Sequence, residues 1–234
     1  MYDLLELYAR PYREDEPVIC VDEKSNQLLQ QSRTPIPARP GAPVKEDYEY
    51  WRAGTRNIFH AVEPRGGYRQ AEVTARRTKP DFVQFIGRLV EKVYAGAQKI
   101  HLVMDNLNTH FRSSFVEVLG VKRAEQMLER VEFHYTPKHA SWLNMAEIEI
   151  GVMDRQCIGG RLASEAMLKS EVAAWKRRRN QAQTRIEWKF THDKMPTMNY
   201  PGTMYHNLIV TVLDTVVIQL PLHNDSVSSN GRIF

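Results

Sequence analysis

The chain has 234 residues, a formal net charge of +4 and 42% hydrophobic residues, enough for one sizeable α/β domain with a true core. It contains no apolar run of about 18 or more residues, and residues 1–10 carry acids where an export signal needs a basic start and an apolar stretch. We therefore expect no membrane span and no export. Cys20 and Cys157 both lie in apolar segments, so a reducing cytoplasm is the expected compartment.

The first third of the chain predicts strands. The β-branched run "PVICVDEK", residues 17–24, predicts a strand that ends near Asp22. Residues 25–49 contain repeated prolines and predict a long Pro-rich loop. Between residues 55 and 76, two β-prone arms flank the Pro64–Gly67 segment, which is typical of a hairpin.

Helices and strands are expected to alternate after residue 80. Helical spacing of apolar residues predicts a helix over 81–94, and the run "KIHLVMD" predicts a buried strand over 99–105. A helix over 113–130, a strand over 131–137 and helices over 145–158 and 164–184 follow. A helix between parallel strands, with antiparallel strands at one side, predicts an α/β fold with a mixed sheet covered by helices.

Three acids stand where such a fold would bring them together. Asp22 and Asp105 each end an expected strand, and the following helix begins with Glu147 and Glu149. Residues two apart on a helix point about 200° apart, so only one of these glutamates can face a shared cleft. Glu147 shares its face with small and polar residues, which favours it by a small margin. Three carboxylates suit Mg²⁺ or Mn²⁺, although a strand-end aspartate more often caps a helix or makes a turn.

Basic residues gather late in the chain. The segment "WKRRRNQAQTR", residues 175–185, is either a solvated helix surface or a surface that follows DNA phosphates. A second pair stands just before the glutamate helix and is open to the same two interpretations. The candidate phosphate contacts are Lys176, Arg177, Arg178 and Arg179, with Lys138 and His139.

Six segments carry a resemblance to a known family. The segments "VICVDEK", "YWRAGTRNIFHAVEP", "RRTKPDFVQFI", "HLVMDNLNTH", "FHYTPKHASWLNMAEIEIG" and "WKFT" resemble the DDE endonuclease domain of bacterial insertion-sequence transposases related to the Tc/mariner superfamily. The pair "MDNLNTH" and "TPKHASWLN" is highly specific. The resemblance implies a ribonuclease H-like fold whose catalytic, metal-binding acids are Asp22, Asp105 and Glu147, the last because it follows the family's leucine-asparagine pair.

The resemblance also implies a chemistry and its partners. Two Mg²⁺ or Mn²⁺ ions would serve cleavage at transposon ends and transfer of the strand to target DNA. Asn108 and His110 belong to the family motif and either support the metal site, contact the DNA backbone or fix the turn. The loop 25–49 stands where mariner-like relatives carry a clamp between subunits, which favours a homodimer. The stretch between Asp105 and Glu147 is longer than in eukaryotic relatives, and we expect a longer helix around 121–130.

The chain departs from the family at both ends. Met1 stands only about 20 residues before the first acid, which leaves no room for a helix-turn-helix module, so a separately encoded helix-turn-helix half is a possible partner. Residues 1–191 are expected to form the catalytic domain and residues 192–234 a divergent C-terminal tail, from a shifted reading frame or a replaced terminus.

Three functions follow from these expectations. The first is a transposase catalytic domain in the bacterial cytoplasm, associated with the nucleoid. The second is a truncated, catalytically silent remnant that only binds DNA. The third is a ribonuclease H-like nuclease for other nucleic acids, which the family segments disfavour. His134 and His139 have no matching cysteines and are not expected to form a structural zinc site.

Overall fold

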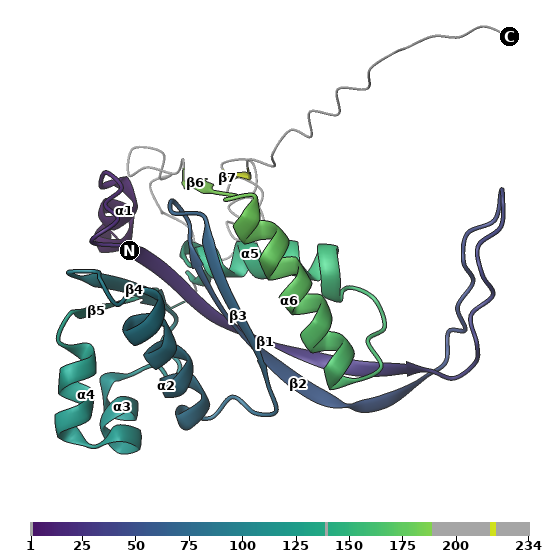
Figure 1. Cartoon of the computed structure of the whole chain (residues 1–234), viewed down its shortest axis with the longest axis horizontal. Coiled ribbons are helices and arrows are strands. Elements are labelled where there is room, and N and C mark those ends of the chain that lie inside the picture. Colours follow the sequence, from purple (N-terminus) through teal and green to yellow (C-terminus); the bar gives the residue numbers. More distant parts are fainter. Residues whose placement is uncertain (1, 139, 189–215, 219–234) are drawn as a thin grey trace, which may run out of the picture.

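The fold is built on one mixed sheet. The computed structural model describes residues 2–138, 140–188 and 216–218, and its main sheet has five strands in the order β3-β2-β1-β4-β5 (Figure 1). The strands are β1 (Val18–Gln31), β2 (Tyr50–Glu63), β3 (Tyr68–Thr74), β4 (Ile100–Met104) and β5 (Val131–Tyr135). The pairs β1·β2 and β2·β3 are antiparallel, whereas β1·β4 and β4·β5 are parallel. The expected mixed, ribonuclease H-like sheet is confirmed.

Helices cover both faces of this sheet. The elements α2 (Lys79–Arg88), α3 (Arg112–Leu119) and α4 (Val121–Leu128) lie on one face, and α1 (Tyr2–Ala9), α5 (Met145–Met153) and α6 (Glu165–Gln181) on the other (Figure 1). Two helices continue as π-helical turns, α2 into Leu89–Val93 and α5 into Asp154–Ile158. A small second sheet pairs β6 (Ile186–Trp188) with β7 (Val216–Ile218).

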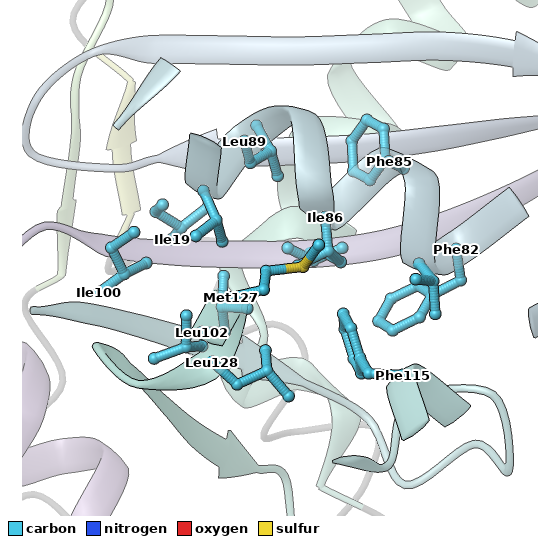
Figure 2. Packing of buried hydrophobic residues seen from close by; sticks show 14 of the residues in the cluster. Ile19, Phe82, Phe85, Ile86, Leu89, Ile100, Leu102, Phe115, Met127 and Leu128 are labelled. Atoms are coloured by element: carbon cyan, nitrogen blue, oxygen red, sulfur yellow. The ribbon is translucent and has the colours of Figure 1, made fainter. Parts of the chain in front are cut away.

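The central strands are buried on both faces, which explains their unbroken apolar runs. On β1, Ile19 and Val21 join the cluster that packs against α2, α3 and α4, whereas Cys20 joins the cluster on the opposite face. Figure 2 shows the first cluster, in which Phe82 and Met127 reach the sheet from different helices. Successive side chains of a strand therefore serve two cores.

The prediction of one helix over 113–130 was wrong in one respect. Two helices, α3 and α4, occupy this stretch and meet at Gly120, which has φ +79° and ψ 160°. Only glycine adopts this backbone region without strain. The extra length between the second and third acids is therefore a separate helix.

Replacing Gly120 by alanine should lower the free energy of unfolding by about 1–3 kcal/mol, the usual cost of this backbone region for other residues. A Cβ at Gly120 would meet nothing within 4 Å, so the cost would come from the backbone alone. Gly96, which also has open space but no positive φ, provides the matched control. Urea unfolding of both alanine variants tests this, and equal stabilities of the two would contradict it.

The first strand is longer than expected. It continues past Asp22 to Gln31 and pairs with β2 as far as Tyr50, so the two strands form an arm that leaves the body of the domain (Figure 1). The early part of the predicted loop 25–49 is therefore strand, because Leu28 packs under α6 in a third cluster and β2 supplies hydrogen-bond partners. The remainder, from 32 to 49, contains two isolated bridges.

Some expectations fall on residues that the structure does not describe. These are His139 and almost all of the expected C-terminal tail, residues 192–234. Within the described part of the chain, no helix combines the length and the apolar character that a bilayer span requires.

Candidate active site

The sheet places Asp22 and Asp105 side by side. The parallel strands β1 and β4 pair through Cys20 and Val103, and each aspartate follows its strand's paired residue by two positions. Residues two apart on a strand face the same side of the sheet. Both carboxylates therefore project toward the face that α5 covers, at the point where β4 ends and β1 continues, paired with β2 only, toward the arm.

The start of α5 is fixed to the same strand. The Asn144 side chain caps α5 by accepting a hydrogen bond from the backbone N of Ala146 at 3.1 Å. The same side chain donates through Nδ2 to the carbonyl oxygen of Val21 at 2.8 Å. One buried asparagine thus holds the first turn of α5, which contains Glu147, against the residue that precedes Asp22.

The three carboxylates repel one another. Burial, together with the charges of Glu147 and Asp105, raises the pKa of Asp22 to about 7, against a hydrogen bond from the backbone N of Glu23 that lowers it. The pKa of Glu147 is also raised, first by loss of hydration and then by the charge of Asp105, while Ser141 opposes the shift. This is an anionic pocket that a bound cation would stabilise.

A titration follows from the raised pKa of Asp22. The folded protein keeps this proton at pH values where the unfolded chain has lost it, so the free energy of unfolding should fall as pH rises from 3.8 to about 7. Asp22→Asn, which cannot ionise, should be more stable than wild type above pH 7, and the difference should vanish below pH 3.8. Urea unfolding with a chelator present measures this, and parallel pH profiles of the two proteins would contradict it.

A buried histidine joins Asp105 to a fourth acid. Nδ1 of His110 lies 2.7 Å from Oδ1 of Asp105, and its Nε2 lies 2.9 Å from Oε1 of Glu23. Burial opposes a charge on His110, but the hydrogen bonds and charges of the two acids outweigh it and raise its pKa to about 9. An imidazolium at neutral pH therefore holds Asp105. Sequence reasoning missed Glu23, whose only signal was its place beside Asp22.

The structure separates the two glutamates of α5. Glu149 is fully buried, and its two oxygens accept hydrogen bonds from Arg69 at 2.9 and 3.2 Å and from Arg179 at 2.9 and 3.0 Å. Both oxygens are occupied by guanidinium groups. Glu147 is exposed and interacts with the charge of Asp105, so it is the glutamate that remains open to a ligand.

The basic residues of α6 do not form one surface. Arg179 is 5% exposed, pairs with Glu149 and lies over the ring of Trp175, so its assignment as a DNA contact is corrected by its burial. Lys176 is half-buried and donates to Oε1 of Gln70 at 3.0 Å. The residues of the predicted set that are exposed are Arg177, Arg178 and Lys138.

Asn108 lies exposed in the turn after β4. Its backbone carbonyl accepts a hydrogen bond from the hydroxyl of Ser114 at 3.3 Å, at the start of α3. This contact involves the backbone of Asn108 and favours a role in the turn, and the residue as a whole is exposed.

The oxygens of the three acids are spread over more than the width of a single-ion cage. Within the described part of the chain, no choice of one oxygen from each of Asp22, Asp105 and Glu147 brings all three oxygens within 4.8 Å of one another. The set is therefore wider than a cage for one ion. A pair of Mg²⁺ or Mn²⁺ ions about 3.5–4 Å apart spans a wider set of oxygens.

Comparison with known proteins gives one family and several distant structures. A family model described as DDE superfamily endonuclease matches residues 17–169, which include all three acids. A crystal structure of the Mos1 mariner paired end complex with Mn is 17% identical, with a TM-score of 0.47, and the match covers 75% of this chain and 52% of that one. A crystal structure of a pre-cleavage Mos1 transpososome is 16% identical, with a TM-score of 0.48, and the match covers 77% of this chain and 56% of that one.

A Drosophila P element transposase strand transfer complex is 12% identical, with a TM-score of 0.30, and the match covers 77% of this chain and 45% of that one. The chain thus spans about half the length of the solved structures that it matches. No curated protein sequence matches it. The likenesses to solved structures concern the fold alone. The match to the family model covers more than half of the chain.

Proposed function

We propose, from the premise that this chain belongs to the DDE superfamily endonuclease family, that it is the catalytic domain of a transposase. It would cut DNA at transposon ends and transfer the freed strand to target DNA. The observation that supports this most is the mutual repulsion of Asp22, Asp105 and Glu147 on one face of a ribonuclease H-like sheet. A structural role does not require three acids to crowd together without a cation among them.

The proposed mechanism assigns a task to each residue. Asp22, Asp105 and Glu147 would hold two divalent ions, which supply activation of the attacking oxygen and stabilisation of the leaving one. His110 and Glu23 orient Asp105 through the contacts described above. They are positioning residues, because they act on the reaction through a ligand.

The DNA would reach the site along exposed basic residues. Lys138 lies in the loop before α5, and Arg177 and Arg178 lie on the open side of α6. Each would neutralise a phosphate and release counterions, so the binding should weaken as salt rises. His139 remains a proposed contact from the sequence alone.

The proposed assembly has two copies of the chain. Trp51 at the start of β2 is 67% exposed, and Tyr48, in the segment just before it, is 85% exposed. Large apolar side chains that are exposed on a protruding arm suit a contact with a second subunit. A separately encoded helix-turn-helix half remains a proposed partner that would supply recognition of the transposon ends.

Nicking of supercoiled plasmid by the purified chain tests this function. We expect cutting in Mn²⁺ or Mg²⁺ that a chelator abolishes. Salt-sensitive DNA binding without any cutting, also after a helix-turn-helix half is supplied in trans, would support the silent remnant instead. A preference for RNA–DNA hybrids over DNA would support the general nuclease.

A further inference from the structure

Two histidines and a glutamate meet on β4 and β5, before the strand end that Asp105 follows. His101 lies on β4, and Glu132 and His134 lie on β5, where the register pairs His101 with Glu132 and Val103 with His134. Paired and alternate residues share a face, so the three side chains project to the same side. One possible ligand atom from each lies within 4.8 Å of the others. Asp105 follows His101 by four residues, about 13 Å along the strand.

The donor atoms of these three residues have nearly the spacing of ligands in a zinc site. Nδ1 of His101 lies 2.9 Å from Nε2 of His134 and 3.6 Å from a carboxylate oxygen of Glu132, and Nε2 of His134 lies 3.7 Å from the other oxygen. Ligands bound at about 2.0–2.1 Å in a tetrahedron lie about 3.3–3.4 Å apart. The shortest of these distances, between the two nitrogens, belongs to a hydrogen bond between the imidazole rings of His101 and His134. A bound ion would take the place of the hydrogen in this bond.

Burial and charge also suit a divalent ion. The side chains of His101 and His134 are 3% and 12% exposed, whereas that of Glu132 is 43% exposed. Burial lowers the pKa of both histidines, which favours the neutral rings that can offer a lone pair to a metal. The open side at Glu132 leaves room for water as a fourth ligand. The ammonium group of Lys99 pairs with Glu132 and competes with an ion for this carboxylate.

We propose that His101, Glu132 and His134 bind one Zn²⁺ ion that ties β5 to β4. Two imidazole nitrogens and a carboxylate are a common zinc ligand set, whereas Mg²⁺ prefers oxygen ligands alone. β5 is an edge strand with a single neighbour in the sheet, so a metal that joins it to β4 would strengthen an end of the sheet. The sequence alone places His134 near His139, and no zinc site is expected from that pair. In this proposal His134 binds zinc together with His101 from β4 and Glu132 from β5. The proposal is independent of the proposed function.

Zinc titration of the whole purified chain against a chromophoric chelator tests the proposal, with excess Mg²⁺ present to occupy oxygen-only sites. We expect one equivalent of zinc to bind. Glu132→Gln and His134→Gln should each weaken binding at least about 10-fold, since even loss of an outer partner of a ligand costs that much. Glu129→Gln provides the matched control, because Glu129 is an exposed acid three residues before Glu132.

Two further measurements sharpen the result. Lys99→Gln should tighten zinc binding by freeing Glu132, and zinc should raise the melting temperature of wild type but not of Glu132→Gln. The proposal is overturned if wild type binds no equivalent of zinc, if Glu132→Gln and Glu129→Gln weaken binding equally, or if Lys99→Gln binds zinc more weakly.

Discussion

Glu147→Gln is expected to lower metal-dependent DNA nicking at least about 100-fold, because loss of even an outer partner of a metal ligand costs about 10–100-fold. The exposed Glu147 has no ion pair in the structure, and its charge is opposed by that of Asp105. Its removal should therefore leave the fold as stable as wild type, or more so. Plasmid nicking at equal protein concentrations measures the activity, and urea unfolding measures the stability.

Wild-type activity in Glu147→Gln would show that the third ligand lies elsewhere. A loss of activity that accompanies unfolding would also contradict this assignment, because the exposed Glu147 has only a hydrogen bond with Ser141, which is itself exposed, among the contacts described above.

Glu149→Gln is expected to have the largest effect on stability. It would leave the guanidinium groups of Arg69 and Arg179, which are 0% and 5% exposed, without a counter-charge. Breaking a buried ion pair by removing one partner costs about 3–5 kcal/mol of the free energy of unfolding. The same substitution at Glu147, two residues earlier, changes the same chemical group in the same helix and serves as the control.

Urea unfolding of both glutamine variants makes the comparison. Glu149→Gln should unfold at a much lower urea concentration than Glu147→Gln. Equal midpoints would mean that the buried contacts among Glu149, Arg69 and Arg179 contribute little, and that the choice between the two glutamates rests on weaker ground.

Local patterns predicted much of the fold. The apolar run before Asp105 correctly indicated a buried strand, and the β-branched run before Asp22 correctly indicated a strand, because parallel strands that are covered by helices require such runs. The order of strands and helices then predicted the mixed sheet. The end of β1 was harder to predict, because residues after Asp22 have no apolar run and obtain their strand conformation from β2 and from the packing of Leu28.

The contacts of the site depend on residues far apart in the sequence. His110 meets Glu23 across 87 positions, and Arg69 meets Glu149 across 80, distances at which no local pattern operates. A signal for Arg179 did exist, since Trp175 lies four residues earlier and therefore on the same helical face. A buried tryptophan at that spacing indicates that Arg179 faces the core.

The most direct test of a metal site made by three acids is titration of Mn²⁺ into the purified chain, with free Mn²⁺ followed by electron paramagnetic resonance. The account predicts two ions bound at the acids and a clear loss of binding in Asp105→Asn. Asp154→Asn should bind as wild type does, because that carboxylate pairs with Lys24 at 2.6 Å. Unchanged Mn²⁺ binding in Asp105→Asn would contradict the account.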